Sequence, residues 1–205
     1  MTEQSDDRLA AEWRWIRDPD FTIGGSVLFA RGAPAEQVIQ AFGMDPVNAV
    51  SLPLARTSEA LRYPVMDERL NVLHPWIRAG QEDEWGFAVD QGSVNAFELS
   101  AAARELSAGT DVATFQWTMT IDNFEYLVDG TVVTAFEPLL SHQRTGTEPD
   151  RFLPLTRLVG LKVDPDDDDM TLDTRISLLE ILTMGLGIRL PADVVRGPLL
   201  TVQRV

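Results

Sequence analysis

The sequence predicts an α+β protein: a single domain over residues 1–205, in which a mostly antiparallel sheet of five to six strands has helices packed on one face. Between positions 111 and 121, apolar and polar residues alternate strictly, which is the period of a strand that is buried on one side. Asp129-Gly130 then separates two further strand-like runs, which predicts a tight hairpin. The apolar row is Ala113, Phe115, Trp117, Met119 and Ile121, and the polar row is Thr114, Gln116, Thr118 and Thr120.

The N-terminal part of the chain predicts two helices and one strand. Ser5 is a suitable N-cap for a helix that runs to about Arg17, and Trp15 lies off the apolar stripe of that helix. The run SVLFAR at 26–31 predicts a strand, and a helix over 34–42 follows it. Residues 45–71 contain three prolines and little periodicity, so we expect an irregular excursion there.

The middle of the chain predicts a hairpin and then a capped helix. The hairpin joins a strand at 75–80 to a strand at 84–90. Asn95, with Glu98 three residues later, is a capping-box pattern, which predicts a helix that begins there and ends near Leu106. The three strands of the alternating region follow this helix directly.

The last third predicts helices on either side of an acidic loop. A short helix is expected over 150–161, and the acidic loop occupies 162–170. The run 171–186 is apolar on nearly all sides, which predicts a largely buried helix. A final helical turn at 191–196 and a strand at 199–204 complete the expected elements.

Composition limits the kind of partner. The net charge is −15, and such a surface repels nucleic acid phosphates and anionic lipid, so we expect no nucleic acid and no membrane partner. A charged protein partner is expected to be basic, although acidity also serves solubility alone. The chain has no cysteine, and its N-terminus lacks the basic and apolar regions of a signal peptide, so we expect a cytoplasmic protein. Composition leaves the oligomeric state open.

Motifs for catalysis or cofactor binding are missing from the sequence. The histidines, His74 and His142, have no nucleophile elbow or phosphate-binding glycine loop beside them. The run Asp164–Asp169 fails the spacing of a calcium loop, and its carboxylates suit the N-terminus of the next helix. We therefore predict no catalytic, cofactor-binding or metal-binding residues.

Two groups of residues remain as candidate sites. Tryptophans anchor many protein interfaces, and a polar strand face offers a docking surface beside them. The predicted interaction surface comprises Trp15, Thr114, Gln116, Thr118 and Glu125. A candidate pocket lies in the polar loop after the third strand of the alternating region, at His142 and Arg144, and Arg144 and Arg151 flank this loop with the charge to clamp a carboxylate or phosphate. Buried tryptophans, plain solvent-exposed sheet and solvated loop side chains are the alternatives.

Loose sequence patterns along most of the chain point to a family. They are Trp13-x-Trp15, SVLFARGAPAEQVIQAFG, Trp85-Gly86-Phe87, ELSAAARELSAGTDVATFQW, FEYLVDGTVVTAFEP and LLEILTMGLGIRLPADVV. In these the chain resembles an uncharacterised actinobacterial family, the domain of unknown function 6461. The resemblance implies a single soluble domain and brings no activity and no functional residues. Residues 45–71 depart from the shorter connection expected in that family.

Three hypotheses for function follow. The leading one is a non-enzymatic protein-interaction module with an immunity-, antitoxin- or regulator-like role. The second is a small-molecule-binding protein or enzyme with a pocket between sheet and helices, where Glu125, His142 and Arg144 would supply the polar groups. The third is a structural or oligomeric role, in which a sheet edge pairs across a two-fold axis.

Overall fold

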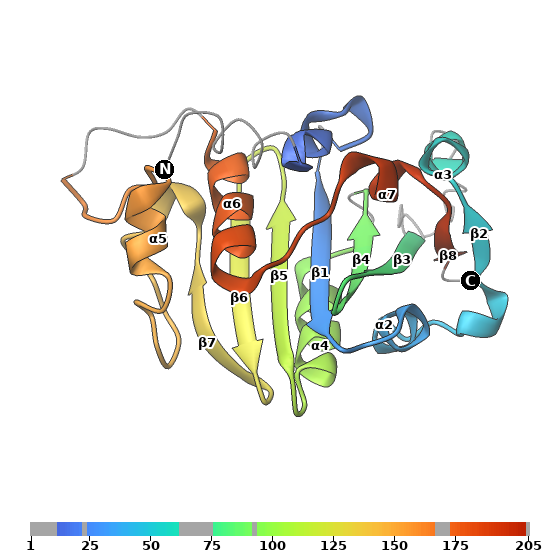
Figure 1. Cartoon of the computed structure of the whole chain (residues 1–205), viewed down its shortest axis with the longest axis horizontal. Helices are drawn as coiled ribbons and strands as arrows, with labels where there is room; N and C mark the ends of the chain where they lie inside the picture. The colour runs from blue at the N-terminus through green and yellow to red at the C-terminus, as the bar shows by residue number, and fades with distance from the viewer. Residues whose placement is uncertain (1–11, 22–23, 62–75, 92–93, 167–172, 204–205) are drawn as a thin grey trace, which may run out of the picture.

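One antiparallel sheet organises the described part of the chain in the computed structural model, which covers residues 12–21, 24–61, 76–91, 94–166 and 173–203. The sheet has 8 strands in the order β2-β8-β3-β4-β1-β5-β6-β7 (Figure 1). The strands are β1 (Gly25–Arg31), β2 (Val50–Leu52), β3 (Trp76–Glu82), β4 (Trp85–Asp90), β5 (Asp111–Trp117), β6 (Asp122–Val128), β7 (Thr131–Phe136) and β8 (Leu199–Gln203).

Helices and 3-10 turns connect the strands. The helices are α2 (Ala35–Ala41), α3 (Leu54–Leu61), α4 (Ala96–Leu106), α5 (Leu153–Leu158), α6 (Thr174–Leu186) and α7 (Ala192–Arg196). The 3-10 turns are η1 (Arg14–Arg17), η2 (Pro19–Phe21), η3 (Pro46–Asn48) and η4 (Pro138–Leu140). Among the described residues, none of these helices has both the length and the apolar character that a bilayer crossing requires.

The sheet is larger than the sequence predicted, with 8 strands in place of five to six. One addition is β2, which lies within the segment expected to be irregular. Residues 46–61 of that segment form η3, β2 and α3, and the remainder of it is outside the described residues. The other is β8, whose strand character was expected but whose place between β2 and β3 was not.

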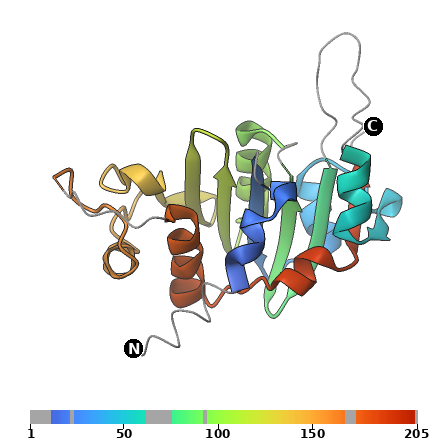
Figure 2. The same ribbon diagram turned by 90° about the horizontal axis from the view of Figure 1, so that it is seen from above.

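Helices cover both faces of the sheet, so the prediction of helices on one face is wrong (Figure 2). Along β1, Val27 and Phe29 belong to one core cluster and Leu28 and Ala30 belong to the other. The first cluster is covered by η1, α6 and α7, and the second by α2 and α4. Central strands are therefore buried on both sides, as in sheets that have no solvated face.

The predicted hairpin at the turn between β6 and β7 is confirmed. Asp129 and Gly130 both have positive φ, at 49° and 73°, as a two-residue hairpin turn with right-handed strand twist requires. Ala113, Phe115 and Trp117 are buried as expected.

The predicted apolar row continues too far, however, because β5 ends at Trp117. The Thr118 hydroxyl accepts hydrogen bonds from the backbone N–H groups of Thr120 and Ile121, at 3.2 and 2.9 Å. This side-chain closure turns the chain. Met119 and Ile121, expected in the core, consequently lie in solvent.

The predicted helix ends hold in two places. Asn95 accepts hydrogen bonds from the N–H groups of Phe97 and Glu98, and the Glu98 carboxylate accepts from the Asn95 N–H, which completes the capping box. Gly187, in the left-handed conformation with φ 71°, ends α6. The helix expected over 150–161 is shorter and spans α5 alone.

The N-terminal tryptophans lie in the core. Trp13 and Trp15 donate indole N–H hydrogen bonds to the Thr183 hydroxyl (2.9 Å) and the Leu190 carbonyl (2.8 Å). Trp15 is only 1% exposed and packs edge-on against Phe21, so its assignment to an interaction surface is wrong. The start of the helix predicted from Ser5 lies outside the described residues.

Candidate functional site

Helix α4 covers most of the polar strand face that was expected to dock a partner. Thr114 is buried, and Gln116 donates to the Val94 carbonyl (3.2 Å) at the start of α4. Glu125 lies opposite Thr114 in the β5–β6 register and is partly buried. Of the predicted surface, Thr118 alone is exposed, and its hydroxyl is used to close the β5–β6 turn. The five residues therefore do not form one surface.

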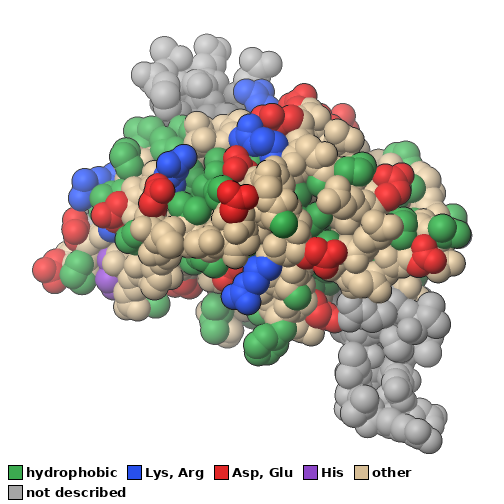
Figure 3. Space-filling view, turned by 90° about the horizontal axis from the view of Figure 1, so that it is seen from below, with side chains coloured by type: hydrophobic (Ala, Val, Ile, Leu, Met, Phe, Trp, Pro, Cys, Tyr) green, Lys and Arg blue, Asp and Glu red, His purple; other side chains and the backbone are tan. Residues whose placement is uncertain are grey.

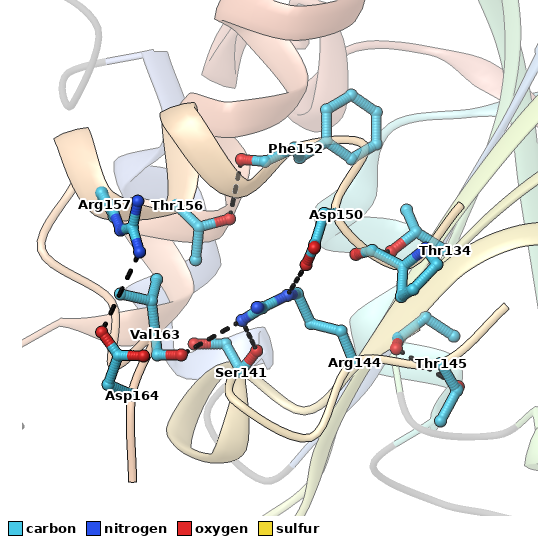
Figure 4. Close-up of polar contacts among 12 residues, drawn as sticks. Thr134, Ser141, Arg144, Thr145, Asp150, Phe152, Thr156, Arg157, Val163 and Asp164 are labelled. Carbon is cyan, nitrogen blue, oxygen red and sulfur yellow. Dashed lines mark hydrogen bonds and ion pairs between the residues drawn. The ribbon is translucent and has the colours of Figure 1, made fainter. Parts of the chain in front are cut away.

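Arg144, predicted to line a pocket, binds its own chain instead (Figure 4). Its Nε donates to Asp150 Oδ1 at 2.9 Å, and its Nη1 donates to the carbonyls of Ser141 and, at 3.4 Å, Val163. Only 13% of the side chain is exposed. The guanidinium thus cross-links three segments of a loop region, and these donors face protein acceptors.

His142 lies in the same loop. Its Nε2 is 3.3 Å from the side-chain amide nitrogen Nε2 of Gln143, and its Nδ1 is buried without a hydrogen-bond partner. The structure therefore places His142 and Arg144 in one short segment, but gives the arginine a structural role. Among the described residues, no three His, Asp or Glu side chains gather as a metal site would require.

Exposed apolar side chains gather at one end of the sheet, which we call the apolar end. The β5–β6 turn, η4 after β7, and the start of α4 beside Gln116 all lie there. The apolar end comprises Phe97 (89% exposed), Met119 (79%), Ile121 (64%), Leu140 (45%) and Leu139 (42%). Several exposed apolar side chains at one end of a sheet indicate an interaction site more strongly than scattered single ones do.

Two carboxylates lie beside the apolar end in different electrostatic states. Asp122 receives a bidentate ion pair from Arg175, at 2.9 and 3.1 Å. Glu137 has no arginine partner among the described residues, and burial raises the pKa of its carboxyl group, with nearby Asp122 adding to the rise. One oxygen of Glu137 is buried without a partner. Asp122 is therefore neutralised by Arg175, and Glu137 is the carboxylate beside the apolar end that has no cation partner among the described residues.

A row of polar side chains crosses the opposite end of the sheet, and we call it the strand-end row. The Arg31 guanidinium lies 4.7 Å above the ring of Trp85, its partner in the β1–β4 register, and pairs with Glu84 at 3.0 Å. Arg31 Nε is also 3.2 Å from Asp111 Oδ2, without hydrogen-bond alignment. Tyr126 bonds to Asp111, and its hydroxyl pKa is raised by burial first and by this carboxylate second.

Two donors of the strand-end row are unused. The indole N–H of Trp85 and the Nε–H of Arg31 are both buried without a hydrogen-bond partner. Figure 3 views this end of the molecule, where acidic, basic and hydrophobic side chains are interspersed. A cation beside a free N–H donor is suited to a carboxylate or carbonyl oxygen.

Arg78 is a buried cation that the sequence reasoning missed. It is 1% exposed on β3 and donates to the carbonyls of Val195 (2.7 Å), Gly197 (2.8 Å) and Leu52 (3.2 Å). Burial lowers the pKa of its guanidinium to about 10. Two of its acceptors are at the end of α7, where the helix dipole favours a positive charge. The arginine within the apolar run WIRAG was the available signal.

These features define an α+β protein built on one antiparallel sheet, packed on both faces, whose exposed chemistry lies at the two ends of its strands. The chain belongs to the family of unknown function DUF6461, which matches residues 8–196. No curated protein and no solved structure matches it.

Proposed function

We propose that this protein is a non-enzymatic interaction module that binds a basic protein partner through the apolar end, in an immunity-, antitoxin- or regulator-like role. The supporting observation is the exposure of five large apolar side chains around the β5–β6 turn and η4. Buried at an interface, each such side chain contributes about 1.5–3 kcal/mol. The absence of cysteine fits action in the cytoplasm, and the resemblance to an actinobacterial family supports an actinobacterial origin as part of this proposal.

The net charge of this protein indicates that its partner is basic. The chain carries a net charge of −15, which steers a cationic protein toward it and repels an anionic one. Ser141, directly after η4, hydrogen-bonds the Lys162 carbonyl, so the exposed Asp164 and Asp166 follow closely along the adjoining segment. With Glu137, these acids give a basic partner several charges to meet around its apolar contacts.

Matched variants test this proposal. Ile121→Asp places a charge in the apolar end, whereas Leu158→Asp makes the same change at a similarly exposed position on α5, with 64% and 60% exposure. Affinity capture from lysate at low and moderate salt is expected to recover one stoichiometric basic protein with wild type and L158D, and to lose it with I121D. Recovery of no stoichiometric partner at either salt concentration, or equal recovery by I121D, would contradict the proposal.

A small-molecule-binding role, with or without catalysis, is the second candidate, and the strand-end row favours it. The unpaired Trp85 N–H beside the Arg31 cation is a recognition element for a small carboxylate. Titration with succinate, followed by tryptophan fluorescence, is expected to show saturable binding that Arg31→Gln removes. A linear response, or an unchanged affinity in R31Q, would exclude this role for the row.

A further inference from the structure

The two edge strands of the sheet, β7 and β2, differ in whether another described segment pairs with their outer sides. At the β7 edge, the backbone of Thr145 pairs with Ala135 in both directions, at 3.0 and 2.9 Å. Thr147 and Glu148 donate to the next carbonyls of β7, those of Val132 and Val133, at 3.1 and 2.8 Å. This edge is closed by the protein's own loop.

Among the described residues, nothing pairs with the β2 edge. β2 is the last strand in the sheet order, and no described strand pairs with its outer side. Val50 on β2 is 59% exposed, and Val47 just before it is 87% exposed. Soluble proteins protect such an edge by shortness, proline, charged side chains, a bulge or a covering segment, and of these β2 has shortness and flanking prolines but no charge. Positions 46–55 contain no charged residue, in a chain of which 24% is charged.

We propose that the β2 edge pairs antiparallel with β2 of a second copy of this chain, which joins two 8-stranded sheets across a two-fold axis. A strand that meets its own copy in this way is self-complementary, because each backbone donor faces the same acceptor in the other copy. With Ser51 on the axis, Val50 of each copy faces Leu52 of the other, so each directly opposed pair is apolar and no like charges meet.

Charge selects a second copy over a basic partner at this edge. Two chains with net charge −15 repel each other over most of their surfaces, so an uncharged edge is where two copies approach at least cost. A cationic protein finds no carboxylate between positions 46 and 55 and gains nothing from steering there. Pro46 and Pro53 keep the strand short, so the pairing is limited to a few residues and the dimer is weak, with a dissociation constant on the order of micromolar to millimolar.

Sedimentation velocity over a concentration series up to about 1 mM tests the pairing, because a millimolar complex is substantially formed there. Val50→Lys adds an edge-blocking charge, and Leu158→Lys is the control with the same charge change at an equal exposure, 59% against 60%. Wild type and L158K are expected to shift from monomer to dimer with rising concentration, while V50K remains monomeric with an unchanged circular dichroism spectrum.

Three results would overturn the pairing: a wild type that is monomeric throughout, a V50K protein that dimerises like wild type, or an L158K protein that loses the dimer equally. If V50K does not fold, Val47→Lys, outside the strand, replaces it with the same expectations. Hydrogen exchange gives a second readout, since amide protection in residues 50–52 should rise with protein concentration in wild type. Constant protection across a series in which the protein dimerises would place the dimer contact elsewhere.

Discussion

Replacing Arg78 by methionine tests whether a buried cation without a carboxylate partner among the described residues stabilises this fold. Methionine has a similar length and no charge, so Arg78→Met removes the donor while it keeps much of the packing. The three carbonyls that now accept from the guanidinium, at 2.7, 2.8 and 3.2 Å, lose this donor in the variant.

Two opposing effects set the size of the change. The drop of the Arg78 pKa to about 10 corresponds to a burial cost of about 3 kcal/mol, which methionine avoids. Against this, each hydrogen bond from a charged donor contributes about 1.5–3 kcal/mol, and three of them are lost. The lost bonds outweigh the saved burial cost, so we expect R78M to be less stable by about 2–5 kcal/mol.

Urea denaturation followed by tryptophan fluorescence measures this difference directly. The control is Arg104→Met, an exposed arginine on α4, which is expected to change the free energy of unfolding by less than about 0.5 kcal/mol. An R78M protein as stable as wild type, with an unchanged denaturant slope, would refute the reasoning, because it would show that the three carbonyl contacts only repay the burial of the charge.

Three further predictions concern the sheet and its ends. The Glu137 pKa is raised in the folded state, so the stability that this group contributes is present at low pH and is lost as the pH rises through that pKa. In urea melts, the free energy of unfolding of Glu137→Gln should therefore increase relative to that of wild type between about pH 4 and pH 7. Asp122→Asn should lose about 1–3 kcal/mol in the same assay, whereas Glu148→Gln, at the ion pair with Arg151 that is exposed on both sides, should lose less than about 0.5 kcal/mol; equal losses would contradict this ranking. Gly86→Ala should lose about 3 kcal/mol or more, because the added methyl carbon would lie 1.9 Å from the Ala33 carbonyl oxygen, and a normal melting temperature would count against it.

Local signals predicted the parts of this fold that depend on neighbours in sequence. The Asp129-Gly130 turn, the Asn95 capping box and the buried helix α6 each depend on residues within a few positions of one another. Sheet order does not, and nothing in the periodicity of Leu199–Gln203 indicates that this strand lies between β2 and β3.

Two strands carried a sequence signal for burial of both sheet faces, but the prediction followed the alternation at 111–121 instead. The strands at Gly25–Arg31 and Trp85–Asp90 are runs of mostly apolar residues without alternation, which is typical of strands covered on two sides. A single alternating strand reports only its own surroundings. On β5, moreover, the threonine at 114 is buried under α4, so a polar residue type did not mean a solvated face.

The predicted exposure of Trp15 and the predicted burial of Met119 and Ile121 were both wrong, each for a geometric reason. Trp15 lies off the apolar stripe only if the segment is an α-helix. The segment is instead the 3-10 turn η1, in which the side chains follow a tighter period. Met119 and Ile121 continued the alternation of β5, so the pattern hid the turn that exposes them. The apolar end therefore became visible only when the strand end was known.

The position of β8 between β2 and β3 also sets an order of events during synthesis. β2 leaves the ribosome well before β8, so it has no sheet partner until Leu199–Gln203 has emerged. The acceptors at Val195 and Gly197 emerge only shortly before β8, so the Arg78 charge stays in water until then. This side of the sheet is therefore exposed to misassembly until β8 docks.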